Sequence, residues 1–270
     1  MHKSFDQNMP AMRDVAGWVP PIARIGYAAK GVVYMLVGWI AFQAAMASGE
    51  TEGSTGALAS LADEQGGRLM LMLIAVGLLA HVIWRAVQAL LDPEHHGTGA
   101  KRVAMRGFYA LSAVVYGSLA LTAWQLGQGN GQGQDDGHEV WVGRLLEQPF
   151  GTWLVMLAGL GVTAYGLHQM YKAWRGDVNR RMAANRAEVA RGVRILGRVG
   201  TAARGLVMLP VGWFVFNAGR HYRAAEAADT GEVLAMLDKG WLLAVVGIGL
   251  LAYGLHQVAK AIYRRIARPA

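Results

Sequence analysis

The chain alternates between long apolar runs and shorter polar segments, and this pattern predicts membrane-spanning helices. Six runs approach the roughly 20 residues needed to cross a hydrocarbon core of about 30 Å. They cover residues 32–47, 69–91, 108–126, 153–174, 206–218 and 241–262. The first and fifth runs are short, and we expect them to extend backward through residues 26–31 and 200–205. The pattern therefore predicts an all-α integral membrane protein with six transmembrane helices.

Two sequence blocks recur along the chain. Residues 23–44 resemble residues 197–218, with Arg24 aligned on Arg198, and GLGVTAYGLHQMYKA at 159–173 resembles GIGLLAYGLHQVAKA at 247–261. Recurrence at intervals of roughly 75–100 residues indicates repeats of a two-helix unit. Because small residues let helices approach closely in lipid, we expect three hairpins with their glycine-rich faces buried against each other. Such hairpins would form a bundle around a pseudo-threefold axis.

Composition supports the membrane interpretation over a soluble helical bundle. The chain is 54% hydrophobic and 16% charged, whereas soluble domains carry about 25% charged residues. It contains no cysteine, which excludes disulfides, thiolate metal sites and cysteine nucleophiles.

Basic residues are concentrated in alternate connections, which predicts the orientation. Of the 26 Lys and Arg, all but five lie before the first span, near or after the end of the last, or in or beside the second and fourth connections. The exceptions are Arg68, Arg144, Arg220, Arg223 and Lys239. Since Lys and Arg are retained on the cytoplasmic side, both termini are expected in the cytoplasm. The net charge of +8 then reflects topology, and no aromatic-basic groove typical of nucleic-acid binding is present.

These patterns divide the chain into three hairpins and their polar flanks. Residues 1–21 contain no apolar core of a signal peptide. The expected units are a cytoplasmic tail at 1–21, repeat 1 at 22–92, a linker at 93–100, repeat 2 at 101–176, a basic segment at 177–196, repeat 3 at 197–265 and a tail at 266–270.

The basic segment before the fifth span has the pattern of an amphipathic helix. Met182, Val189, Val193, Leu196 and Val199 share one helical face. Much of the remaining surface is arginine, including Arg186, Arg191, Arg194 and Arg198. Such a helix suits the surface of an anionic inner leaflet. The alternative is a solvated helix that extends the fifth span.

Three short motifs carry a family resemblance. They are YAAKG at 27–31, LLEQPFG at 145–151 and AYGLH at 164–168. In these motifs the chain resembles the bacterial membrane family called domain of unknown function 1206, over nearly all of residues 22–265. Repeat 1 departs from the pattern, with QGG at 65–67 and AHVIW at 80–84. The resemblance implies six spans in three pairs and a location in the bacterial inner membrane, and it brings no assigned activity.

Polar residues that recur near the end of each hairpin are candidates for a ligand-binding or pore-lining layer. They are Tyr165, His168, Gln169 and Lys172, then Tyr253, His256, Gln257 and Lys260, and in repeat 1 His81, Trp84 and Arg85. Spacings of three and four residues place them along one helix face. Ionisable residues within spans are costly and suggest function. The alternative is an interfacial belt in which Tyr and His anchor the helices and Lys reaches lipid phosphate.

A second set of basic residues is expected at the inner leaflet. Lys30, Arg106 and Arg204 are predicted to open spans one, three and five at a similar level. With Arg186, Arg191, Arg194 and Arg198, they would contact the inner leaflet. Pro210, inside the fifth span, is expected to kink it.

Catalytic chemistry is not indicated. No nucleophile–base motif, phosphate loop or zinc-protease motif is present, and no Asp or Glu lies within an apolar run. We therefore expect a non-enzymatic protein without metal or cofactor. His168 and His256 could ligate haem only if they faced a shared cavity.

Three functions remain open on the sequence. The first is a membrane module that uses its basic cytoplasmic face to bind anionic lipid, a protein partner or a second copy of the same chain. The second is a channel or transporter for a small solute or ion along or beside the pseudo-threefold axis. The third is a haem-binding membrane protein. The first is favoured, because transporters usually carry more polar groups near the midplane.

Overall fold

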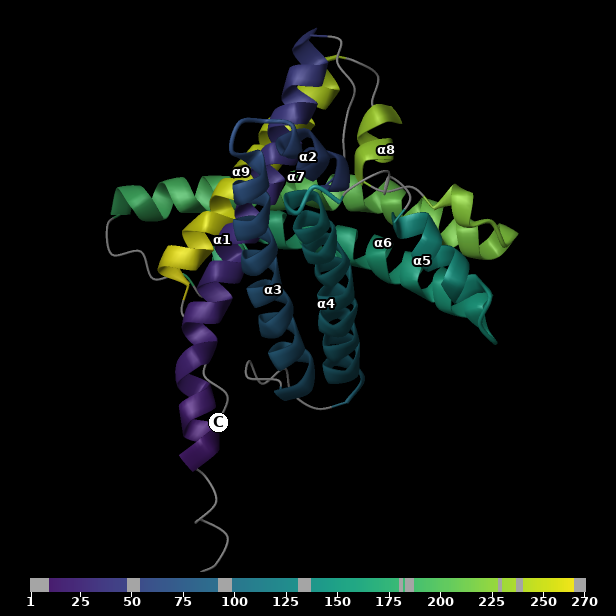
Figure 1. The fold of residues 1–270 in the computed structure, drawn as a ribbon, viewed down its shortest axis with the longest axis horizontal. Helices are drawn as coiled ribbons and strands as arrows, with labels where there is room; N and C mark the ends of the chain where they lie inside the picture. Colours follow the sequence, from purple (N-terminus) through teal and green to yellow (C-terminus); the bar gives the residue numbers. More distant parts are fainter. Residues whose placement is uncertain are drawn as a thin grey trace, which may run out of the picture.

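The computed structural model describes residues 10–47, 54–91, 99–130, 137–179, 182, 187–227, 230–236 and 240–264. Within these residues the chain forms helices and no strand (Figure 1). The long helices are α1 (Pro10–Ala47), α3 (Gly67–Leu91), α4 (Ala100–Gly127), α6 (Gly151–Arg175), α7 (Ala187–His221) and α9 (Trp241–Tyr263). Shorter helices lie between them: α2 (Ser54–Ala62), α5 (Gly137–Leu146), η1 (Asp177–Asn179), η2 (Ala224–Glu226) and α8 (Thr230–Met236).

Five helices are long and apolar enough to cross a membrane. These spans are Trp18–Met46, Gly67–Leu91, Met105–Gly127, Glu188–His221 and Trp241–Tyr263. Helix α6 has 25 residues but is not among them, since its last turns carry polar and basic side chains. The described residues therefore contain one fewer candidate span than the sequence pattern predicted.

Two helices begin earlier than the apolar runs indicated. Helix α1 begins at Pro10 and continues through Pro20 and Pro21, so it includes residues 10–21 of the segment expected as a cytoplasmic tail. Val19, Ala23 and Tyr27 pack against the buried Trp84 of α3, and this packing holds the extension. Helix α7 begins at Ala187 and runs without a break into the fifth span.

Residues 187–196 of the basic segment thus form the first part of α7 and extend the fifth span. Met182 lies outside this helix and forms an isolated bridge with Arg264. Pro210 lies within α7, which continues on both sides of it.

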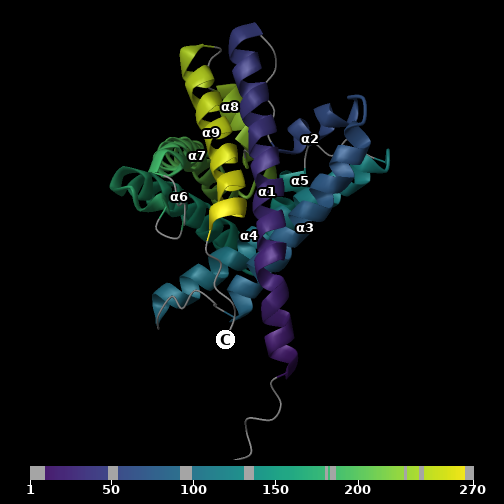
Figure 2. The ribbon, with the colours of Figure 1, turned by 90° about the vertical axis from the view of Figure 1, so that its left-hand side faces the viewer.

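The closest helix pairs join successive repeats. Repeat 1 contributes α1 and α3, repeat 2 contributes α4 and α6, and repeat 3 contributes α7 and α9. The main pairs are α3 with α4, α6 with α7, and α9 with α1. In Figure 1, α6 and α7 run across the view while α1, α3, α4 and α9 run up and down; Figure 2 shows α9 beside α1. The last helix therefore packs on the first, and within the described residues the series of packed helices is open between α4 and α6.

Glycines allow two of these pairs to pack backbone against backbone. A Cβ atom placed on Gly31 of α1 would lie 2.8 Å from the carbonyl oxygen of Gly254 in α9. The equivalent contact between α7 and α6 brings a Cβ on Gly205 to 2.9 Å from the carbonyl oxygen of Gly166. In each helix pair a second glycine contact lies seven residues further along the helices. It joins Gly38 to Gly247 in one pair and Gly212 to Gly159 in the other. This agrees with the expectation that the repeats bury glycine-rich faces against each other.

The register of repeat 2 differs from the sequence prediction. Arg106 donates to the carbonyl oxygens of Ala89 and Leu90 at the end of α3. Arg198 makes the same contacts with Ala173 and Trp174 at the end of α6. Arg106 is therefore the counterpart of Arg198 rather than of Arg204.

This register explains why repeat 2 is more open than the other two. A Cβ on Gly26 of α1 would lie 2.6 Å from the backbone nitrogen of His81, so α1 and α3 touch. The repeat-2 counterpart of Gly26 is Phe108, which stacks on Tyr165 with ring centroids 4.2 Å apart. Gly161 of α6 has nothing within 4 Å of a Cβ, and α4 and α6 share no extensive contact in the described part of the chain.

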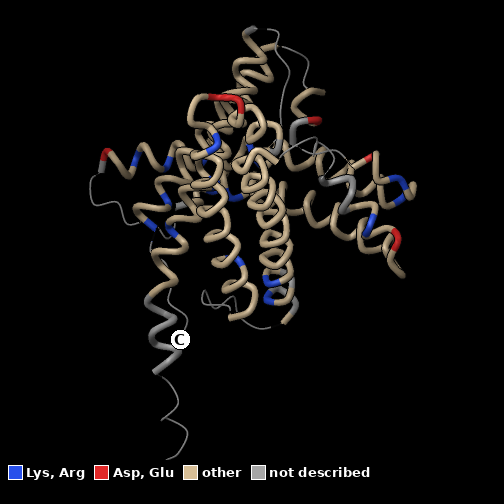
Figure 3. Tube along the Cα trace, in the orientation of Figure 1, with Lys and Arg blue, Asp and Glu red and all other residues tan. Residues whose placement is uncertain are grey.

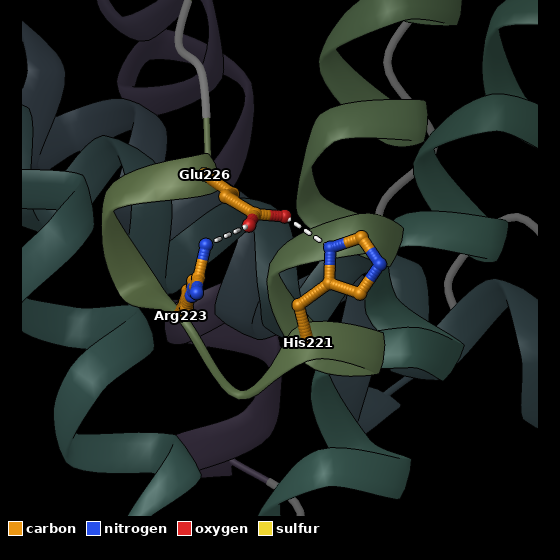
Figure 4. Close-up of polar contacts among 3 residues, drawn as sticks. All are labelled: His221, Arg223 and Glu226. Carbon is orange, nitrogen blue, oxygen red and sulfur yellow. Dashed lines mark hydrogen bonds and ion pairs between the residues drawn. The ribbon is translucent and has the colours of Figure 1, made fainter.

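Three polar side chains lie in the turn that joins the C-terminal end of α7 to η2. Glu226 pairs with His221 and lies 3.6 Å from Arg223 (Figure 4). All three side chains are substantially exposed, so these pairs fix the turn and contribute little to global stability.

Candidate functional site

Two buried cations lie where the three repeats meet. They are Lys30 of α1 and Arg204 of α7, whose side chains are 2% and 7% exposed. Four tyrosines, taken from α1, α4, α6 and α9, surround them: Tyr34, Tyr116, Tyr165 and Tyr253. We call these six residues the cation–tyrosine cluster.

Arg204 is held by hydrogen bonds and by aromatic rings. Its Nε donates to the Tyr34 hydroxyl at 2.8 Å, and its Nη1 donates to the Tyr165 hydroxyl at 3.0 Å. The guanidinium carbon lies 5.2 Å from the ring centroids of Tyr165 and Tyr253 and 5.4 Å from that of Tyr34. These distances are within the range of cation–π attraction.

Lys30 shares two of those rings. Its Nζ lies 4.4 Å from the ring centroid of Tyr116, 5.8 Å from that of Tyr34 and 5.9 Å from that of Tyr253. The hydroxyls of Tyr116 and Tyr34 are 3.5 Å apart. Both cations therefore lie against the same group of tyrosine rings.

The cluster has no acidic partner among the described buried residues. The buried polar and charged residues are Lys30, His81, Gln88, Gln169, Thr201, Arg204, His256 and Gln257. Burying a cation without a counter-charge is costly, and tyrosine rings offset part of that cost. The arrangement concentrates positive charge and hydrogen-bond donors at one point.

A second polar network lies beside the cluster and joins repeats 1 and 3. The Tyr27 hydroxyl accepts from Trp84 Nε1 at 3.2 Å and from Arg264 Nη1 at 2.6 Å. Arg85 donates to His81 at 3.4 Å and to Gln88 at 2.9 Å. The His81 ring stands 4.8 Å from that of Tyr116, so this network borders the cation–tyrosine cluster.

The predicted layer is therefore divided rather than continuous. Tyr165 and Tyr253 lie in the cluster, and His81, Trp84 and Arg85 lie in the adjacent network. Gln169 of α6 and Gln257 of α9 are buried, whereas Lys172 and Lys260 are partly buried.

The two candidate haem ligands are not brought together. His256 is completely buried in α9, whereas His168 is exposed on α6. Helices α6 and α9 share no extensive contact in the parts of the chain described here. His168 is exposed because α4 does not cover the face of α6 on which it lies. The haem alternative thus has no geometric support.

Several basic residues lie elsewhere than the sequence predicted. Lys30 and Arg204 were expected to contact the inner leaflet, but they are buried, because the helices pair across repeats and enclose them. Arg106 and Arg198 bind the ends of α3 and α6. Arg191 and Arg194 are exposed on α7, and Arg186 lies outside the described residues.

Sequence reasoning missed four residues that hold the site: Tyr27, Tyr34, Tyr116 and Arg264. A signal for two of them was present. The triplet Val-Val-Tyr occurs at 32–34 and again at 114–116, and it aligns Tyr34 with Tyr116 in the register that the structure has.

Comparison with known proteins bears on the repeat. The family described as Domain of Unknown Function (DUF1206) matches residues 25–92, 108–176 and 199–264. These matches begin one or two residues after Arg24, Arg106 and Arg198, which supports the corrected register. An uncharacterized protein of Bacillus subtilis (strain 168), YxxB, is 29% identical over 255 residues, covering 92% of each chain. No solved structure matches. Three family matches, each on one hairpin, show that this chain belongs to the family of domain of unknown function 1206.

Proposed function

We propose that the protein is a six-span inner-membrane module, with both termini in the cytoplasm, that binds anionic phospholipid at the basic ends of its helices. The observation that carries the proposal is the surface where α6 ends and α7 begins. Arg191, Arg194 and Arg198 are exposed there. So are Trp174 and Ile195, at 78% and 57%. Arginines beside exposed aromatic and aliphatic side chains are typical of a helix at the lipid headgroup level.

The distribution of charge supports the proposed orientation. In Figure 3, basic positions gather toward the left-hand end of α7 and at the lower end of α4, where these helices begin, while most acidic positions, together with some basic ones, lie toward the opposite ends. The last turns of α6 and α9 also carry Lys172, Arg175 and Lys260. An anionic leaflet attracts such residues by about 1 kcal/mol each, which favours lipid over a protein partner or a second copy.

The exposed face of α6 supports a sixth span. Leu154, Leu157, Leu160 and Leu167 are 47–61% exposed on it. α6 also packs along α7 through the same glycine contacts that join α9 to α1. A helix with this exposed leucine surface is stabilised by lipid rather than by water.

The first test compares two double variants of one helix. R191Q/R194Q removes two exposed arginines at the proposed cytoplasmic end of α7. Two residues at about 1 kcal/mol each predict roughly 30-fold weaker retention of phosphatidylglycerol, measured by native mass spectrometry of the detergent-purified protein. The matched control, R220Q/R223Q, removes the same charge at the other end of α7 and should retain the lipid. Equal losses in both variants, or no loss in either, would contradict the proposal.

The second test addresses topology, and the absence of cysteine makes it direct. In intact cells, a membrane-impermeant thiol reagent should label Ser60→Cys, an exposed position on α2. It should label Arg191→Cys only after the membrane is permeabilised. The reverse pattern would invert the proposed orientation.

A further inference from the structure

We propose that the cation–tyrosine cluster is a binding site for an anion, which would accept hydrogen bonds from Lys30 and Arg204. This site is separate from the exposed arginines assigned to lipid. It is formed by residues of all three repeats, so it exists only in the assembled fold.

The excess of hydrogen-bond donors over acceptors in the cluster supports an anionic ligand. A lysine ammonium carries three donors and a guanidinium carries five, and neither carries an acceptor. Two of the Arg204 donors are satisfied by Tyr34 and Tyr165. Each tyrosine hydroxyl that accepts from Arg204 keeps a proton of its own to donate. The cluster is therefore rich in donors and poor in acceptors, which is the composition of an anion site.

The charge balance leads to the same ligand class. Two cations share the rings of Tyr34 and Tyr253, and the described buried residues include no Asp or Glu. Aromatic rings attract cations but do not neutralise them. A bound anion would supply the missing charge and bond to both cations at once.

Repeat 2 offers the route to the cluster. Tyr165 is half-buried; its hydroxyl accepts from Arg204, and its ring stacks on Phe108. Ala164, beside it on α6, is exposed, whereas its repeat-3 counterpart Ala252 is buried. Tyr165 thus separates Arg204 from the faces of α4 and α6 that do not pack together.

The anion could be a free ion or the phosphate of a lipid that enters between α4 and α6. Both would present oxygen atoms to the same donors. Thermal unfolding of the full-length protein in detergent tests the two sources. One series is titrated with phosphate, nitrate or chloride at constant ionic strength set with gluconate, and a second series is titrated with short-chain phosphatidic acid.

In one of these series we expect the unfolding temperature to rise and saturate for the wild type. K30M and R204Q should weaken the apparent affinity by at least about tenfold. The control R106Q also removes one arginine, which lies on α4 outside the cluster and binds the end of α3, and this variant should respond like the wild type. Saturation with inorganic anions identifies a free ion, whereas saturation with phosphatidic acid alone identifies a lipid headgroup.

K30M keeps the proposal falsifiable if R204Q fails to fold. Because it removes a buried charge, K30M should be at least as stable as the wild type without added anion. Two results would overturn the proposal: no saturable response of the wild type in either series, or an undiminished response of K30M. Loss of phosphatidylglycerol from R191Q/R194Q tests a different surface and leaves this inference unaffected.

Discussion

Gly254→Leu is expected to lower the free energy of unfolding by more than about 4 kcal/mol, which is exceptional for a single substitution. A Cβ at Gly254 would lie 2.6 Å from the carbonyl oxygen of Gly31 and 2.8 Å from the backbone nitrogen of Met35. Backbone atoms cannot rotate away as side chains can, so α9 and α1 must separate. In lipid, packing is a main force that holds helices together. Thermal unfolding in detergent and the fraction of monodisperse protein would measure the loss.

Gly161→Leu is the matched control for this prediction. Gly161 also lies within a repeat helix, yet a Cβ there would meet nothing within 4 Å. Leucine should therefore leave stability unchanged or raise it by up to about 1 kcal/mol, because glycine is a poor helix former. If both variants were equally damaged, close backbone packing would not be the reason for the glycine at 254.

Tyr34→Phe is expected to cost about 2–3 kcal/mol, although it removes a single oxygen atom. That oxygen accepts from Arg204 Nε at 2.8 Å and lies 3.5 Å from the Tyr116 hydroxyl. Without it, a charged donor that is 7% exposed loses its acceptor, and water has little access to replace it. Chemical unfolding of the detergent-purified variant would give the difference.

Tyr171→Phe provides the comparison. Tyr171 is 47% exposed and accepts from Arg175, so water can replace the lost bond and the cost should stay below about 0.5 kcal/mol. The double variant Tyr34→Phe/Arg204→Leu should be less damaged than the sum of its single changes, with a coupling of about 1–3 kcal/mol. Additive effects would show that the hydroxyl does not act through Arg204.

Local signals in the sequence were enough to predict the long helices and the three sequence repeats. Apolar runs mark where a helix can lie in lipid, and the recurring glycines mark where two helices approach. The same signals underestimated the lengths of α1 and α7. Both helices begin in polar sequence and are extended by packing, as Val19 and Ala23 show against Trp84.

The site was harder to predict, because burial depends on which helices become neighbours. Lys30 and Arg204 open apolar runs, where a long cation ordinarily extends to the headgroups. They are enclosed because α9 packs on α1 and α6 packs on α7, a pairing that spacing along the chain does not specify. Aligning Arg106 with these cations by charge also hid the Val-Val-Tyr match that identifies Tyr116.

His168 illustrates the same limit. By sequence it is the counterpart of His256, and a repeat pattern alone predicts equal surroundings for the two. The substitution that separates them lies on another helix, where Phe108 replaces a glycine and keeps α4 from covering α6. Its effect on His168 becomes visible only in three dimensions.

The closure of α9 on α1 also sets an order for synthesis in the cell. Chains are made at about 5–20 residues per second, so α1 waits on the order of 10–40 s for α9 to be translated. During that time the glycine face of α1 and the Lys30 beside it have no α9 to pack against. Helix α1 can therefore pack on α3 early in synthesis, but it acquires its α9 neighbour only after the intervening helices have been made.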